Sequence, residues 1–150
     1  MIPKTGEERA EWLNSLWPDK LEVNRDQIRQ CFAVELANYQ AGVDLDHYEN
    51  LYQAALYLHV LGEPGDAILI YDAKMSSFDL HFGMDYQFML GAGLDKTIEY
   101  ANQTGRSDMA KYLDGLREDP DLPDIEHWLE FKISYFGLPI QQSNDLADSQ

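Results

Sequence analysis

Glycine and proline divide this chain into short segments, and their spacing limits the architectures open to it. Between these breaks, apolar residues recur at three- and four-residue steps, which is typical of amphipathic helices. A glycine after the last apolar residue commonly ends a helix, because glycine readily adopts a positive φ angle. The spacing therefore predicts short helices joined by tight turns, with breaks at Pro18, Gly42, 62–65, 91–93, Gly105 and 137–139.

The first half of the chain carries clear helix signals. Thr5 and Glu8 have the spacing of a capping box, in which a hydroxyl and a carboxylate each bind a backbone amide at the helix start. A second helix, beginning within 24–26, is expected to end at Gly42. The segment 45–61 is apolar on two sides, which predicts a helix at the centre of the fold.

Residues 67–90 allow two interpretations. The run 67–71 is short, apolar and partly β-branched, and from Phe78 to Leu90 apolar residues alternate with mainly polar ones, as in a half-buried strand. Against a hairpin, the region 74–77 lacks the Asn-Gly or Asp-Gly pair that tight hairpins prefer. We favour helix-loop-helix and keep a hairpin within an α+β fold as the alternative.

The C-terminal half predicts two short antiparallel helices, an acidic connector containing two prolines at 118–124, and a last helix closed by Gly137. The polar segment 141–150 is expected to be a frayed tail. Together these features predict a single, mainly α domain over 1–140. Its expected architecture is an irregular bundle of short helix pairs that is partly solenoid-like, although no period repeats often enough for a true array.

Composition limits the classes of function. The chain has 150 residues, 45% of them hydrophobic, so it has enough apolar surface to fold despite a formal net charge of −16. The excess acid must then lie on a folded surface, where it repels phosphate backbones and anionic lipids. We therefore expect no direct nucleic-acid binding and no membrane binding. A lone cysteine, Cys31, and the absence of a signal-like or membrane-spanning segment favour a cytoplasmic location.

The charge is unevenly distributed along the chain. Between Arg29 and Arg106 there are only two basic side chains, Lys74 and Lys96, against eleven acids and seven tyrosines. Rigid tyrosines are effective contacts at protein interfaces, and surrounding acids steer a cationic ligand toward them. This stretch predicts a basic protein as the partner.

The residues that we expect to contact this partner are acids and tyrosines of the same stretch. Tyrosines on one helix, such as Tyr48, Tyr52 and Tyr57, are more often core residues with the hydroxyl at the edge than a binding patch. The predicted partner-binding set is Asp44, Asp46, Tyr48, Glu49, Tyr52, Asp72, Asp79 and Asp85.

No motif identifies a reaction. Asp79, His81 and Asp85 form the densest local group of candidate metal ligands or acid-base residues, and on a strand Asp79 and His81 would share one face. The spacing matches no established metal site, because there is no H-E-x-x-H motif, no cysteine pair and no calcium-binding loop. We predict no catalytic residues, no metal and no cofactor, and keep an enzyme centred on these three residues as an alternative.

In size, acidity, single cysteine and the acid-tyrosine band from Glu35 to Tyr100, the chain resembles small acidic bacterial immunity proteins, which neutralise a toxin. The resemblance is one of general character, without a shared motif. It implies a tight complex with a basic toxin, in which acids of the band meet lysines and arginines. A second alternative is an inhibitor that mimics DNA, and a homodimer through the last helix is compatible with every one of these functions.

Overall fold

The computed structural model of this chain describes residues 1–140, and within that range every regular element is helical. The predicted tail at 141–150 lies outside the described residues. The expected mainly α fold is confirmed. The described residues form eight α-helices, namely α1 (Gly6–Leu16), α2 (Arg25–Ala41), α3 (Glu49–Leu61), α4 (Pro64–Lys74), α5 (Phe78–Gly83), α6 (Leu94–Gln103), α7 (Ser107–Gly115) and α8 (Ile125–Tyr135).

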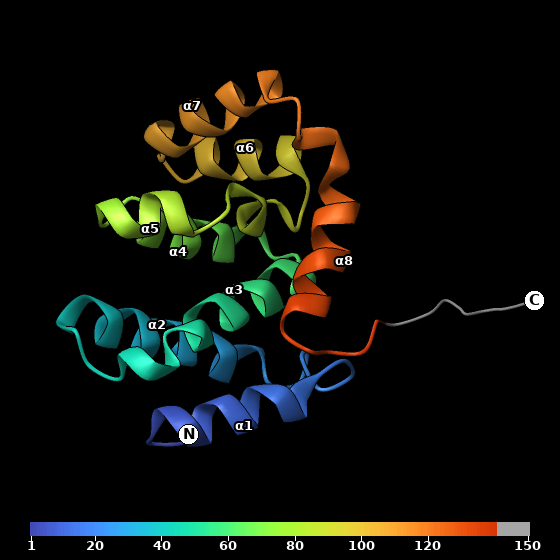
Figure 1. Cartoon of the computed structure of the whole chain (residues 1–150). Coiled ribbons are helices and arrows are strands. Elements are labelled where there is room, and N and C mark those ends of the chain that lie inside the picture. Colours follow the sequence, from blue (N-terminus) through green and yellow to red (C-terminus); the bar gives the residue numbers. More distant parts are fainter. Residues whose placement is uncertain (141–150) are drawn as a thin grey trace, which may run out of the picture.

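Short 3₁₀ turns connect several of these helices: η1 (Leu45–His47), η2 (Tyr86–Leu90), η3 (Leu116–Glu118) and η4 (Leu122–Asp124). Figure 1 shows α1 to α7 stacked in succession from one end of the molecule to the other, while α8 runs across them along one edge. The stacking is solenoid-like, and α8 connects the end formed by α6 and α7 with the region of α3. None of the helices in residues 1–140 has the length and apolar character needed to cross a lipid bilayer.

Local sequence signals explain the helix ends. At the start of α1, Thr5 Oγ1 accepts a hydrogen bond from the amide of Glu8, whose carboxylate accepts one from the amide of Thr5. Gly42 and Gly62 close α2 and α3 with φ angles of 72°. At both glycines the positive φ turns the chain back after the last helical residue, which produces the stack of short helices.

The hairpin considered for residues 67–90 is wrong, because this segment forms α4, α5 and η2. The apolar alternation does not reflect one buried strand face: Phe78 and Phe82 are exposed, whereas Leu80 between them is fully buried. Lys74, at the end of α4, is buried and donates hydrogen bonds to the carbonyl oxygens of His81 and Met84 at the end of α5. These bonds satisfy helix-terminal carbonyls that a helix leaves free.

The core is centred on α3, as its two apolar sides predict. Leu51, Ala54, Leu56 and Tyr57 have no exposed surface. The hydroxyl of Tyr57 donates a 2.7 Å hydrogen bond to the carbonyl oxygen of Leu13, which ties α3 to α1. The helices α2 and α3 pack closely against each other, and α4 packs closely against η2. These packed elements carry the surface side chains described below.

Candidate partner-binding groove

Most acids of the central stretch form ion pairs in the folded protein, although each arginine in these pairs is shared between two acids. Their partners are cations at the ends of the stretch or outside it. Glu35 and Asp44 pair with Arg9, Glu63 with Arg25, Asp66 with Arg29, Asp72 with Arg106, Asp85 with Lys132, and Asp95 with Arg117. The uncompensated acidic band expected from the linear sequence is therefore wrong for these acids. Within residues 1–140, Asp46, Glu49, Asp79 and Glu99 of this stretch have no such cation partner.

Two of the predicted contact residues hold the fold together instead. Asp44 lies 3.3 Å from Arg9, a buried arginine between α1 and α2. Both carboxylate oxygens of Asp72 accept hydrogen bonds from Arg106, at 2.7 and 3.2 Å. The guanidinium of Arg106 thereby links α4 to the turn between α6 and α7. Asp46 is exposed in η1 and does not line the groove described next.

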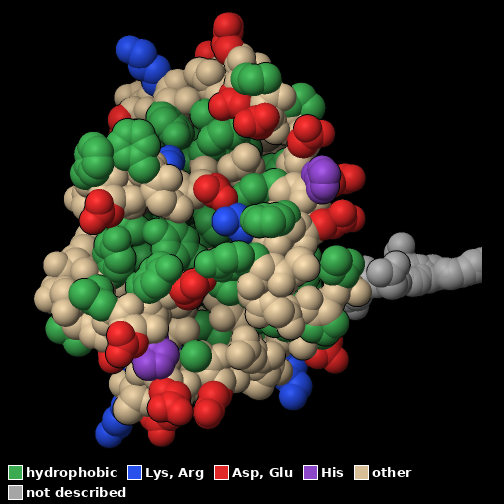
Figure 2. All heavy atoms as spheres, in the orientation of Figure 1, with side chains coloured by type: hydrophobic (Ala, Val, Ile, Leu, Met, Phe, Trp, Pro, Cys, Tyr) green, Lys and Arg blue, Asp and Glu red, His purple; other side chains and the backbone are tan. Residues whose placement is uncertain are grey.

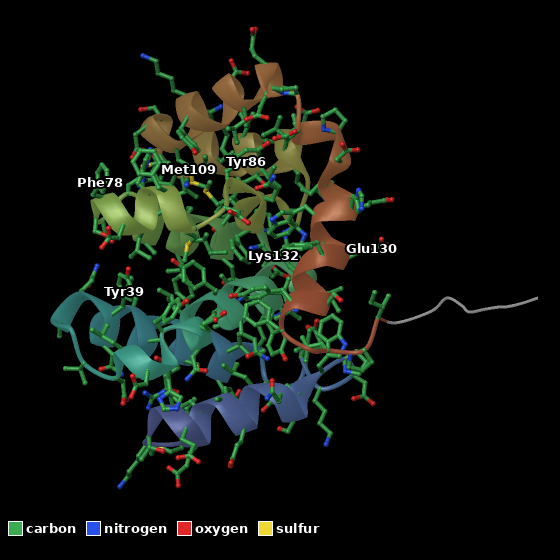
Figure 3. The ribbon with its side chains drawn as sticks, viewed as in Figure 1. Tyr39, Phe78, Tyr86, Met109, Glu130 and Lys132 are labelled. Carbon is green, nitrogen blue, oxygen red and sulfur yellow. The ribbon has the colours of Figure 1, made fainter. Side chains whose placement is uncertain are left out.

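Tyr48, Glu49 and Tyr52 of the predicted set do come together. They line a groove of about 280 Å³ between the start of α3, the end of α5 and the last turns of α8. We call this hollow the tyrosine groove, and its lining residues are Tyr48, Glu49, Tyr52, Gly83, Lys132, Tyr135 and Phe136. Figure 3 places Lys132 on the side of α8 that faces the other helices and Glu130 on the outer side.

Tyr52 forms the middle of the groove. A Cβ atom at position 83 would lie only 2.8 Å from its hydroxyl oxygen, so Gly83 leaves the space into which that hydroxyl reaches. Burial is the main cause that raises the pKa of Tyr52 to about 12, and the nearby Tyr39, Tyr48, Asp85 and Asp79 contribute to the same shift. The phenol is therefore a neutral hydrogen-bonding group at physiological pH, with acids on the side of α5.

A second hollow continues from this region between the end of α2 and the start of α5. It is lined by Tyr39, Gln40, Ser76, Ser77 and Asp79 and has a volume of about 440 Å³. Two of its residues, Tyr39 and Asp79, contribute to the raised pKa of Tyr52. Asp79 is exposed and is the free acid of this second hollow.

Lys132 occupies the α8 end of the tyrosine groove. Its Nζ atom is 3.0 Å from Asp85 Oδ2, which also accepts a 2.8 Å hydrogen bond from the indole of Trp128. The hydroxyl of Tyr135 donates to Glu49 at 3.0 Å, and this bond raises the pKa of Tyr135. Asp85 and Glu49 are thus both bound by side chains of α8.

Exposed aromatic side chains lie on α5 and α8, two of the helices whose ends line the groove. Phe78 is 78% exposed and Phe82 is 70% exposed on α5, and Phe131 and Tyr135 on α8 are 61% and 54% exposed. Figure 2 shows hydrophobic side chains gathered across the middle of this face, with single acidic side chains among them. Large apolar side chains exposed in one region are typical of interaction surfaces.

The enzyme centre considered as an alternative at Asp79, His81 and Asp85 is not assembled in the structure. Asp79 and His81 lie two positions apart on the helix α5, so they project in nearly opposite directions instead of sharing a strand face. Asp85 is already bound by Trp128 and Lys132. Across residues 1–140, no three His, Cys, Asp or Glu side chains are grouped so that they could hold a metal ion.

Sequence reasoning missed the contribution of α8. The sequence predicts a last helix but assigns none of its residues to the partner site, yet Trp128 and Lys132 bind Asp85, Tyr135 binds Glu49, and Phe131 is exposed. Their three- and four-residue spacing around a lysine is a signal for one shared face. Comparisons with protein-family models, with curated proteins and with solved structures give no match.

Proposed function

We propose that this protein is a binding protein that receives a basic segment of a protein partner in the tyrosine groove. The observation that carries this proposal is the convergence of Tyr48, Tyr52 and Glu49 in one groove, between helices that carry exposed aromatic rings. Asp79, in the second hollow, adds another carboxylate without a cation partner in the described part of the chain. Together these groups supply apolar contact area and negative charge in the same place.

The chemistry of the groove favours cationic side chains. Tyrosine and phenylalanine rings bind the apolar stems of lysine and arginine, and their faces attract the charged ends. Free acids around the groove accelerate encounter with a positive partner, and this effect weakens as salt rises. The net charge of −16 acts in the same direction over a longer range.

Neutralisation of a basic toxin, as by immunity proteins, is the specific form of this function that we favour. The groove would then bind a basic segment that the toxin needs for its activity. The complex would form in the cytoplasm of the cell that makes the toxin. Inhibition by DNA mimicry receives no support from the acid arrangement, because most acids of the central stretch are bound to arginines or to Lys132.

A defined peptide library tests the proposal. Random peptides displayed on phage are selected against the wild-type protein, and the selected sequences are then measured by titration calorimetry at low and high salt. We expect enrichment of lysine and arginine, affinities that fall with salt, and a loss of about tenfold in affinity for Tyr52→Ala or Glu49→Gln, as for interface anchors.

Matched control variants lie in a different hollow, between α4 and α6. Glu99 and Tyr100 line it, and Glu99 is an exposed acid without an ion-pair partner in the described part of the chain. Glu99→Gln and Tyr100→Ala are expected to keep wild-type affinity. Selected peptides that lack basic residues, or that bind the groove variants and the control variants equally, would contradict the proposal.

A further inference from the structure

Lys132 is held in the way that an ammonium ligand is held in a recognition site. Its Nζ atom lies 5.6 Å from the ring centroid of Tyr135, 5.7 Å from that of Phe88 and 6.0 Å from that of Phe131. Asp85 supplies a carboxylate at 3.0 Å. Aromatic faces around a cation, together with one acid, are the arrangement by which proteins recognise alkylammonium groups.

The acid of this arrangement is held in place from two sides. Trp128 donates its indole hydrogen to the same oxygen of Asp85 that faces Lys132. The Trp128 ring also packs edge-on against Phe88, with centroids 5.0 Å apart. The surroundings of Lys132 Nζ are thus positioned by α8 and η2 together. One ammonium group, that of Lys132, balances the negative charge of Asp85 there.

The helix that supplies Lys132 is only partly buried. Ile133 is its one buried residue, Trp128 and Leu129 pack half-buried against the core, and the side chain of Lys132 is 20% exposed. At the groove, α8 also makes polar contacts to Asp85 and Glu49. An incoming ammonium ion can satisfy Asp85 as well as Lys132 does, because it replaces one cation by another of the same kind.

We infer that Asp85, Phe88, Phe131 and Tyr135 form an alkylammonium subsite at the α8 end of the tyrosine groove, which shares Lys132 and Tyr135 with it, and that Lys132 is the resident occupant, which a lysine side chain of the partner replaces. This inference rests on the proposed function and names the group that the α8 end of the groove recognises. Lys132 also lowers the affinity of the partner-free protein for weakly binding cations, because such a ligand must compete with Lys132 for the subsite.

The first test empties the subsite. Lys132→Ala removes the occupant, and n-butylammonium, which has the four carbons and the charge of a lysine side chain, is then titrated while the Trp128 indole signal is followed by ¹H–¹⁵N NMR. We expect a saturable shift in Lys132→Ala and at least tenfold weaker binding of n-butanol, which has the shape without the charge.

Two variants serve as controls. Lys132→Met fills the aromatic space without a charge, and Asp85→Asn combined with Lys132→Ala removes the acid, so neither is expected to bind n-butylammonium. A folded Lys132→Ala protein that shows no saturable shift, or that binds n-butanol equally well, would overturn the inference. Neither outcome depends on a partner, so failure here is distinct from failure of the proposed function.

A second measurement uses the wild-type chain and does not depend on the folding of Lys132→Ala. The lysines are dimethylated with ¹³C-formaldehyde, and the Lys132 signal is identified by its loss in Lys132→Met. Ring currents from the surrounding aromatic rings are expected to shift it upfield from exposed lysines such as Lys4. A basic peptide selected as above should return it to their position. A Lys132 signal that coincides with the exposed lysines in the free protein, or that stays upfield when the peptide is bound, would overturn the inference.

Discussion

An ideal Cβ atom on Gly91 would lie 2.0 Å from the carbonyl oxygen of His59. Gly91 follows η2, and its φ of −60° is open to any residue, so its role is the close approach of two backbones and not a turn. The glycine was expected only to break the chain between two helices. Instead it lets η2 pack directly against α3. This packing positions Phe88, which lies in η2, and Asp85, which immediately precedes it, and both belong to the ammonium subsite.

Substitution at this position should therefore be severe. Gly91→Ala forces α3 and η2 apart, and we expect a loss of about 3 kcal/mol or more in the free energy of unfolding, at the upper end for overpacked sites. Urea denaturation followed by circular dichroism measures it. Gly115→Ala is the matched control, because a Cβ atom there meets nothing within 4 Å and the change should be neutral or stabilising. Equal stability of the two variants would contradict the packing argument.

The buried ion pair between Arg9 and Glu35 gives a second prediction. The Arg9 Nε to Glu35 Oε2 distance is 2.5 Å, both side chains are almost fully buried, and Asn50 donates a 3.0 Å hydrogen bond to the same oxygen. Glu35→Leu leaves the buried guanidinium with the partly exposed Asp44 as its one acidic partner in the described residues, beside the carbonyl oxygens of Pro3 and Lys4, and should lower the free energy of unfolding by about 3–5 kcal/mol.

The double variant Arg9→Met with Glu35→Leu removes both charges. Because neither charge then remains buried without its partner, this variant should be markedly more stable than Glu35→Leu alone. Thermal and urea denaturation of the two proteins compare them. If the double variant is as unstable as the single one, packing volume and not charge controls the site.

The stability of the fold should depend on pH through His59. Its Nδ1 atom is 2.8 Å from the carbonyl oxygen of Gln87, and burial lowers the pKa of the imidazole below its usual 6.5, although hydrogen bonds to backbone groups oppose this shift. Below pH 6.5 the unfolded chain takes up a proton at His59 that the folded protein resists. The contribution of His59 to stability is complete above pH 6.5 and is lost as the pH falls toward the lower folded pKa.

Urea denaturation at pH 7.5 and at pH 5 tests this dependence. His59→Gln should reduce the difference in stability between the two conditions. His127 is exposed on α8, so His127→Gln should leave that difference unchanged. If His59→Gln keeps the wild-type difference in stability between pH 7.5 and pH 5, groups other than His59 cause the pH dependence.

Cys31 should be chemically inert in the native protein. The thiol is completely buried, and burial, with the nearby Glu35, raises its pKa to about 12. At pH 8 only about one thiol in ten thousand would be ionised, and the thiolate is the reactive form. We expect no reaction with a thiol-specific disulfide reagent in buffer and complete reaction in denaturant. Rapid labelling of the native protein would show that α2 opens locally.

Local sequence determined much of the backbone. The Thr5 and Glu8 pair specifies the start of α1 through bonds between residues three apart, and Gly42 and Gly62 specify helix ends through their own φ angles. The apolar sides of 45–61 identified the central helix correctly. These features depend on neighbours along the chain, so they can be recognised without knowing the fold. The alternation from Phe78 to Leu90 was ambiguous because tertiary burial, at Leu80 but not at Phe78, decided it.

Tertiary structure alone decided which charges are free. Arg106 reaches Asp72, Arg9 reaches Glu35, and Lys132 reaches Asp85 across long stretches of chain, and no linear spacing encodes these pairs. The sequence therefore determined that the protein is helical and strongly acidic, whereas the fold determined where its unpaired acids and exposed rings meet. The physical reason is that helix formation is governed by nearby residues, while electrostatic compensation depends on distances in space.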